Sequence, residues 1–482
     1  MHRWIWSVID APPNPDCPGC QTLLRRLEHV EQQERRIEKL EARIAQLEEL
    51  LRRNSSNSSR PPSSDSPNQR AGRPPRPPSG RKPGGQPGHE AHMRAPLPAS
   101  QITRRESSDP KRCRRCAASL ASARALDPLR HQVVEIPKIV PDVTEYVLGR
   151  RRCSHCDEVT TAPLPEGVPH GMCGPRLSAM IVLLTGVYRL SRRNAVAFLQ
   201  DVLGVKLSLG SVSNVECKMT EILSGPHEEA LARVQRAQVK HLDATSWAQN
   251  GEARSLWTFA SRQATAFVIT TRATRDAVES VVGKVRGTLV SDRGSQFGFW
   301  AMERRQICWA HLIRRFTAFA ESPKPRVRSL GNALLLLSRL HLREWHRVQK
   351  GKARREELQN LVANLELLFL HHLERGVALR LPAVSGACAN VIAHREALFT
   401  YAFEKGVPPT NNHAERELRT FVLWRKQTAG TRCERGNRFA ERIMTVVHTL
   451  RKQGRHVLSY LDQACIAALR GQQTPAIMLA DP

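Results

Sequence analysis

The chain of 482 residues carries 74 lysines and arginines against 45 aspartates and glutamates, a formal net charge of +29. This excess predicts a polyanionic partner, nucleic acid before membrane. No apolar run approaches the ~20 residues of a membrane span and no signal peptide is recognisable, so we expect a soluble cytoplasmic protein without membrane partners. The twelve cysteines are then expected to be reduced thiols or metal ligands rather than disulfides.

Residues 1–53 are predicted to form a knuckle followed by a coiled coil. Cys17 and Cys20 are either half of a zinc site or two thiols in a turn. A heptad follows, in which Arg26, Gln33, Leu40 and Leu47 fill the second seam. The first seam holds the apolar residues Leu23, Val30, Ile37, Ile44 and Leu51. A homodimeric coiled coil is the first interpretation, and an amphipathic helix packed within its own chain is the alternative.

Residues 54–100 hold eleven prolines, nine serines, seven arginines or lysines and only two acids. Such a segment cannot bury a core. We expect a flexible, positively charged linker that follows DNA phosphates without reading sequence.

Residues 101–170 contain two Cys-x-x-Cys pairs with 36 residues between them. In a reducing compartment this pattern predicts a four-thiolate zinc ribbon. Segments 131–136 and 143–150 alternate like two strands and would fill the gap as a hairpin. The proposed zinc ligands are Cys113, Cys116, Cys153 and Cys156. The arginines expected to contact DNA here are Arg114, Arg115, Arg151 and Arg152.

Residues 171–236 are predicted to be helical. One helix covers 177–188, Ser191 caps a second that stops at Gly204, and Ser208 or Ser211 caps a third. The spacing suits a helix-turn-helix whose outward residues Ser213, Asn214 and Lys218 face DNA. A plain helical connector is the alternative.

Residues 237–312 change to a strand pattern. Strands over 239–247, 255–260 and 266–271 precede a helix over 276–285 and a strand over 288–292. This is the opening order of an α/β ribonuclease-H-like domain. Asp243 lies in the first strand and Asp292 closes the fourth, where adjacent strand ends would bring them together. The alternative for each is a turn residue.

The segment Gln306–Leu312 resembles a fifth strand that enters a basic helix. Cys308 and His311 within it have ligand-like spacing, although such a pair is more often packing. Residues 313–408 read as a large all-α insertion into the catalytic domain. The domain resumes over 409–450, and 451–482 form a helical tail.

The stretch Asn411-Asn412-His413-Ala414-Glu415 opens the last helix of that domain. Asn411 or Asn412 can cap it, and apolar residues then repeat at helical spacing. Glu415 and Glu417 lie on opposite borders of the apolar stripe. Helical geometry therefore leaves both glutamates open as functional residues.

Nearly the whole chain resembles the insertion sequence 66 family of transposases. The resemblance is carried by the Pro-Gly-Gly-Gln-Pro-Gly-His linker, the paired Cys-x-x-Cys motifs and His-Leu-Asp-Ala-Thr-Ser-Trp. It extends through Cys-Trp-Ala-His and Asn-Asn-His-Ala-Glu-Arg-Glu-Leu-Arg. It implies a DDE-type core with Asp243, Asp292 and Glu415 as its acids. Glu417 would then be a surface or supporting residue that pairs with nearby arginines and contributes little.

Such a core would bind Mg²⁺ or Mn²⁺ through carboxylates, with Asp243 as the bridging ligand. Water attack would free a 3′-hydroxyl at each element end, and that hydroxyl would attack target DNA. Arg416 and Arg419 are placed to hold phosphates. The expected partners are element-end and target DNA in the bacterial nucleoid, a second copy of the chain and accessory proteins of the element. A non-catalytic DNA-binding regulator and a structure-specific nuclease are the alternatives.

Overall fold

The computed structural model describes residues 18–52 and 95–479. Cys17 and most of the expected linker lie outside these residues. The described chain belongs to two compact units: one contains residues 148–195 and 208–479, with the N-terminal helix, and the other contains residues 95–147 and 196–207. In the described ranges, no helix has the length and apolar content needed to cross a membrane.

The heptad segment forms one long helix, α1 (Pro18–Arg52). Helix formation is confirmed. The apolar seam side chains that the structure describes are all exposed, by 44% to 55%. They are Val30, Ile37, Leu40, Ile44 and Leu47. Pairing of this helix with a second copy stays a prediction.

The expected hairpin over 131–136 and 143–150 is wrong. Apart from Arg150, these residues are in no strand, and apolar side chains such as Val133, Ile136 and Val143 are 75% to 90% exposed. Alternation alone does not make a strand, because a strand also needs a partner and a surface to bury its apolar face. The observed strands of this region are shorter and flank the second Cys-x-x-Cys pair: β1 (Arg150–Arg152) and β2 (Val159–Thr161) are antiparallel.

The helices predicted over 171–236 are confirmed. Ser191 Oγ accepts the Asn194 N–H at the start of its helix, and Ser208 rather than Ser211 caps the next one, accepting the Ser211 N–H at 3.0 Å. The elements are α2 (Pro175–Val182), the π-helical turn η3 (Leu183–Val187), α3 (Arg192–Leu203), α4 (Leu209–Ile222) and α5 (Ser224–Arg236).

The central sheet has five strands in the order β5-β4-β3-β6-β7. β3, β4 and β5 form an antiparallel meander, and β6 and β7 run parallel to β3. Helix α6 (Arg275–Val282) connects β5 to β6, as predicted. The strands are β3 (Val239–Gln249), β4 (Glu252–Ala260), β5 (Thr265–Thr270), β6 (Thr288–Ser291) and β7 (Arg305–Ile307).

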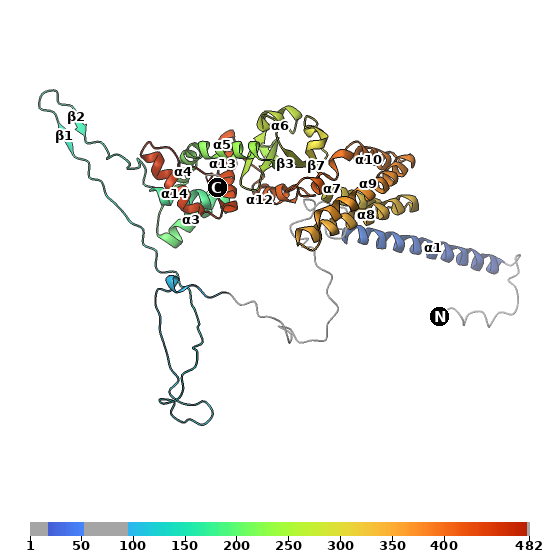
Figure 1. Ribbon diagram of the computed structural model, residues 1–482, viewed down its shortest axis with the longest axis horizontal. Helices are drawn as coiled ribbons and strands as arrows, with labels where there is room; N and C mark the ends of the chain where they lie inside the picture. The colour runs from blue at the N-terminus through green and yellow to red at the C-terminus, as the bar shows by residue number, and fades with distance from the viewer. Residues whose placement is uncertain (1–17, 53–94, 480–482) are drawn as a thin grey trace. The chain divides into compact units, whose positions relative to one another are not determined.

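The two faces of the sheet are covered by different helices. Leu242 and Ala244, alternate residues of β3, point to the same face and belong to the core formed with α5 and α6. Trp247 points to the opposite face, where its ring contacts Phe421 edge-on with centroids 5.6 Å apart. Phe421 belongs to α12 (Asn412–Thr428), which packs on β3 and β4 (Figure 1). Because side chains alternate along a strand, Asp243 lies on the α12 face.

Helix α13 (Glu434–Lys452) covers the edge strand β5 with polar side chains. Thr445 and Thr449 accept the N–H groups of Phe267 and Thr265, and Glu441 accepts that of Ile269. Four helical residues rise about 6 Å and two strand residues about 6.7 Å, so spacing i, i+4, i+8 matches alternate strand residues. The helix thereby satisfies the edge that would otherwise be open to pairing.

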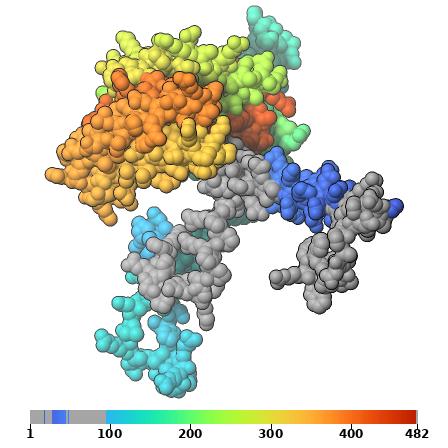
Figure 2. Space-filling view, turned by 90° about the vertical axis from the view of Figure 1, so that its right-hand side faces the viewer, coloured from blue at the N-terminus to red at the C-terminus, as the bar shows by residue number. Residues whose placement is uncertain are grey.

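The segment expected as an all-α insertion is helical. Its helices share an aromatic core that includes Trp309, Phe369 and Tyr401. Figure 2 shows α8 to α10, coloured yellow to orange, as one packed mass. The helices are α7 (Trp309–Ala320), α8 (Pro325–Gln349), α9 (Arg355–Ala378), α10 (Pro382–Ile392) and α11 (Thr400–Phe403). The tail forms α14 (Val457–Leu469), which packs on α2.

Candidate active site

Asp243 and Asp292 come from neighbouring parallel strands. The register pairs His241 of β3 with Val290 of β6. Asp243 follows His241 by two residues and Asp292 follows Val290 by two residues, so the two aspartates lie at the same level on neighbouring strands, Asp243 within β3 and Asp292 just after β6. Asp292 Oδ1 accepts the Gly294 N–H at 2.9 Å, which fixes the carboxylate in the turn after β6.

The other two acids act on the charge of Asp243. Burial, together with the negative charges of Asp292 and Glu415, raises the pKa of Asp243 to about 7. The Ala244 N–H, which donates to Asp243 Oδ1, and Arg314 act in the opposite direction. Three carboxylates from β3, from the turn after β6 and from α12 therefore share one electrostatic environment.

Asn411 fixes the start of α12 against β3. The residue is fully buried, and its side chain donates to the Leu242 carbonyl at 2.7 Å and lies 3.1 Å from His241 Nδ1. It stands at the N-cap position, but its side chain does not cap the helix as the sequence suggested. Its hydrogen bonds go instead to the residues just before Asp243, which sets the position of Glu415 in the first turn.

Three side chains surround Glu415: Arg314 and His311 of α7, and Cys308 at the N-cap of α7. Arg314 Nη2 and His311 Nδ1 lie 3.6 Å and 3.8 Å from Glu415 Oε1. Cys308 joins them, and the ligand atoms of Cys308, His311 and Glu415 all lie within 4.8 Å of one another. Cys308 and His311 have ligand-like spacing along the chain, but spacing alone did not identify a third partner, because Glu415 is more than a hundred residues away.

Glu417 does not have the role expected of it. Its side chain is only 15% exposed, and it pairs with Lys452 at 3.1 Å and with His448 Nδ1, not with arginines. His448 and Lys452 hold the pKa of Glu417 at about 2 against the opposing effect of burial. His413 Nε2 lies 2.7 Å from Lys452 Nζ. Glu417 therefore belongs to a buried ionic network that joins α12 to α13.

Residues 170–438, more than half of the chain, match the transposase IS66 family. The chain belongs to this family. The matched region includes β3, β6, β7 and α12, and with them all three acids. The family consists of nucleic-acid-processing enzymes whose partner is DNA.

The N-terminal part has a separate relationship. Residues 13–95 match a family of unknown function, DUF6444, which covers α1 and most of the expected linker. No protein with a curated description matches the chain. The family membership therefore rests on residues 170–438, and the N-terminal modules have to be interpreted from their own residues.

The residues expected to contact DNA are mostly accessible. Asn214 and Lys218 of α4 are exposed, whereas Ser213 is half-buried and lies 3.3 Å from an Arg435 guanidinium nitrogen. The exposed arginines are Arg114, Arg115, Arg151, Arg152, Arg416 and Arg419. Arg152 also pairs with Asp157 at 2.8 Å. Accessibility is compatible with phosphate contacts for all of these except Ser213.

The two Cys-x-x-Cys turns have the same local structure. In each, the N–H of the first cysteine donates to the carbonyl five residues later, and the residue after the second cysteine, Ala117 or Asp157, has a left-handed φ of 58° or 60°. In each, the preceding arginine, Arg112 or Arg152, donates to the carbonyl of that left-handed residue. Hydrogen bonds within each turn lower the pKa of Cys113 and Cys153. Both turns are therefore suited to present thiolates.

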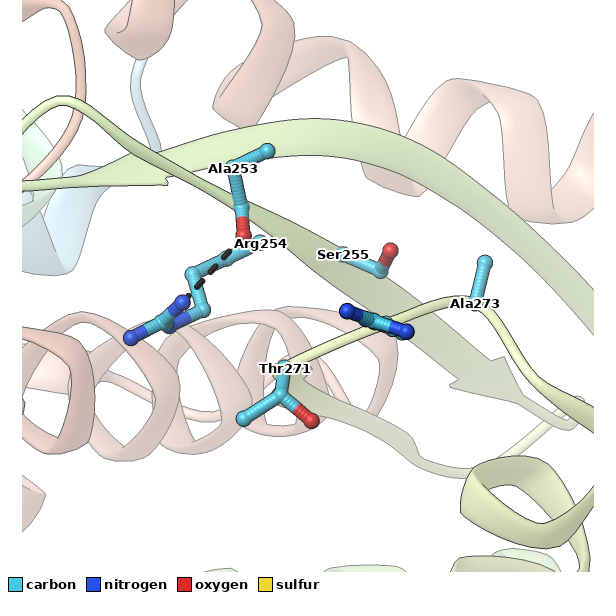
Figure 3. A pocket seen from close by; sticks show the side chains of 6 residues that line it. Ala253, Arg254, Ser255, Thr271 and Ala273 are labelled. Atoms are coloured by element: carbon cyan, nitrogen blue, oxygen red, sulfur yellow. Dashed lines mark hydrogen bonds between the residues drawn. The ribbon is translucent and has the colours of Figure 1, made fainter.

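A separate surface hollow lies between β4 and the segment after β5 (Figure 3). Arg254 and Arg272 line it, and none of the three acids does. Arg254 is paired with Glu252 at 2.7 Å. The hollow adds positive charge to the sheet domain but is not part of the acidic site.

Proposed function

We propose that the protein is a DDE-type transposase that cleaves and joins DNA strands with Asp243, Asp292 and Glu415. The sheet order and strand directions, with three antiparallel strands and two more parallel to the first, support the ribonuclease-H-like domain expected from the sequence. The single observation that carries the proposal is the arrangement of the elements that bear the acids: Asp243 and Asp292 follow paired residues of two neighbouring parallel strands, and Asn411 ties the start of the helix that carries Glu415 to the strand of Asp243. Burial and the charges of the other two acids raise the pKa of Asp243, which is typical of functional acids.

The donor set fits Mg²⁺ or Mn²⁺. Hard divalent cations prefer carboxylate oxygens, and Asp243 lies between the other two acids in the topology, so it is the natural bridging ligand. When bound, such ions activate water and stabilise the charge on the leaving oxygen. Clustered carboxylates with one raised pKa are the environment that a cation neutralises.

The chain's own residues position the DNA. Hydrolysis forms a bond from a water oxygen to phosphorus and releases the 3′ oxygen of the neighbouring nucleotide. The released 3′-hydroxyl then attacks a target phosphorus and displaces the 3′ oxygen there. Arg314 beside Glu415 and the exposed Arg416 and Arg419 of α12 supply positive charge for the phosphates at this site.

The N-terminal modules bind the ends of the element and pair two copies of the chain. Four thiolates from the two matching turns hold one structural Zn²⁺, with arginines on either side for phosphate contacts. A second copy of α1 covers the exposed seam of the first. Elemental analysis of the full chain should lose one zinc when Cys116 and Cys156 are replaced with serine, and sedimentation should show loss of self-association in the Ile37→Asp, Ile44→Asp variant.

The proposal is tested on purified variants with DNA fragments taken from the two ends of the element that carries the gene. Asp243→Asn, Asp292→Asn and Glu415→Gln should each abolish Mg²⁺-dependent strand transfer and leave binding to the end fragments intact. Glu344→Gln, at an ion pair of α8 with Arg347, is the matched control and should remain active. Retained strand transfer in all three acid variants would overturn the mechanism. Cutting of branched DNA without dependence on the end fragments would identify a nuclease instead.

A further inference from the structure

A second group of potential metal ligands lies on the α7 side of Glu415. Cys308 is the N-cap residue of α7, His311 is in its first turn, and Glu415 is in the first turn of α12. A thiol, an imidazole and a carboxylate are the three ligand types of zinc sites. Their ligand atoms lie within 4.8 Å of one another, whereas a tetrahedral ion with bonds of about 2.0–2.3 Å holds its ligands roughly 3.3–3.8 Å apart. Small side-chain rotations would close the difference.

Two atoms of this group are unsatisfied. His311 Nδ1 and Glu415 Oε1 are both inaccessible to solvent, and neither has a hydrogen-bond partner. They face each other at 3.8 Å, which is too long for a hydrogen bond. Buried polar atoms without partners are rare in folded proteins because each costs about 1–3 kcal/mol. A cation bound between them would satisfy both.

The Cys308 sulfur is under opposing influences: burial raises the pKa of its thiol, and hydrogen bonds from backbone N–H groups act in the opposite direction. The side chain is fully buried, and its Sγ accepts the Asn411 backbone N–H at 3.1 Å. The sulfur thus lies where the N-terminal ends of α7 and α12 meet, and the partial positive charge of helix N-termini stabilises an anion. Asn411 is the residue that already fixes α12 to β3, so the sulfur is held in place by the same anchor.

We propose that Cys308, His311 and Glu415 bind a zinc-class divalent cation that locks the first turn of α12 to α7. This inference rests on the proposed function in one respect only, that Glu415 is also one of the three catalytic acids. The cation fixes the orientation of the Glu415 carboxylate. Sulfur and imidazole donors select zinc over Mg²⁺, so this ion differs from those expected at the acids. Three protein ligands leave one tetrahedral position for water or for a DNA oxygen. Arg314 is the positive group nearest Glu415 when the ion is absent.

The test is the zinc content of the full-length protein by elemental analysis. His311→Gln and Cys308→Ala should each remove one zinc per chain relative to wild type. Cys388→Ala, at a buried cysteine of α10 that is outside the group, should remove none. Cobalt-loaded wild type should show a cobalt–thiolate charge-transfer band that is reduced in Cys308→Ala but not in Cys388→Ala. If Cys308→Ala does not fold, His311→Gln decides, because that side chain is one-third exposed.

Unchanged zinc content in both His311→Gln and Cys308→Ala would overturn this inference and leave the catalytic proposal standing. The Asp243→Asn variant tests the catalytic proposal separately from the zinc site. It should keep full zinc content, because Asp243 is not in the group, while losing strand transfer. A wild-type protein without strand transfer whose His311→Gln variant still loses one zinc would overturn the proposed function alone.

Discussion

The acidic site and the two cysteine turns are built in opposite ways. Each cysteine turn is complete within about seven residues, and its hydrogen bonds join atoms no more than five residues apart. The acidic site gathers Asp243, Asp292 and Glu415 from three elements, and its key anchor, Asn411, binds a carbonyl 169 residues away. Local turns should therefore tolerate changes elsewhere in the protein, whereas the acidic site should fail when a single distant contact is lost.

Outside the three acids, the largest combined effect on activity and stability is expected from Asn411→Ala. The change leaves the Leu242 carbonyl and His241 without their partner and frees the start of α12. A shift of about 1 Å at a catalytic group can cost about 100-fold in rate, so strand transfer should fall by roughly that factor. The protein should also lose about 2–4 kcal/mol of unfolding free energy from the unsatisfied buried groups.

Asn412→Ala is the matched control for this change. Asn412 is the next residue, is exposed, and donates no side-chain hydrogen bond to β3 among the contacts that the structure describes. Its variant should retain near wild-type strand transfer and urea midpoint. Equal losses in the two variants would mean that Asn411 acts only as part of the helix start.

The next effect is expected from Glu417→Gln, through stability rather than chemistry. The change leaves Lys452, only 12% exposed, without its carboxylate, and breaking such a pair costs about 3–5 kcal/mol. Urea unfolding should show this loss, while the exposed Glu434→Gln on α13 should show almost none. The double change Glu417→Gln, Lys452→Met should recover part of it. A Glu417→Gln protein of wild-type stability would contradict the ionic network.

The same network predicts an acid dependence with a defined sign. Because the pKa of Glu417 is about 2 in the folded protein and near 4.5 when unfolded, the unfolded chain binds more protons between these values. Its contribution is present above pH ~4.5 and is lost as the pH falls toward 2. Unfolding free energy measured across this window should fall less steeply in Glu417→Gln than in wild type, and equal slopes would count against the ionic pair.

A smaller effect is expected from Thr445→Val on α13. The two side chains have almost the same shape, but valine leaves the buried Phe267 N–H of the edge strand without an acceptor. The loss should be about 1–3 kcal/mol. Thr317→Val on α7 is the control, because the Thr317 hydroxyl donates only to a carbonyl of its own helix. Similar unfolding curves for the two variants would show that α13 does not need its polar contacts to cover β5.

The smallest effect is expected in the cysteine turns. Ala117 and Asp157 adopt left-handed backbone that glycine accepts without strain. Ala117→Gly should strengthen zinc binding slightly, by about 0.5–1 kcal/mol or a few-fold in affinity. A zinc-competition titration against Ala118→Gly, at the neighbouring residue, measures the difference. Weaker binding in Ala117→Gly would contradict the turn geometry.

The sequence by itself determined the local elements of the sheet domain. Alternation over 239–247 and 255–260 predicted β3 and β4, and the chain order of three strands, a helix and a strand predicted the sheet. Ser191 predicted one helix start, and Ser208 or Ser211 predicted the next, whereas Glu415 was favoured over Glu417 by the resemblance to a known family and not by helical geometry. The strands and helix starts are encoded within a few residues of one another, by side-chain period, capping and turn chemistry.

Only the tertiary structure decided which of these local preferences were used. Segments 131–136 and 143–150 have a strand pattern but, apart from Arg150, no partner, so they stay outside any sheet. Helical periodicity predicted only that Glu417 lies at the border of the apolar stripe, whereas its ion pairs with Lys452 and His448 depend on the packing of α13 against α12. Cys308 and His311 acquired a third ligand from a helix a hundred residues later. In each case the deciding contact is long-range, and the free energy of burying or pairing a side chain depends on a neighbour that sequence spacing does not identify.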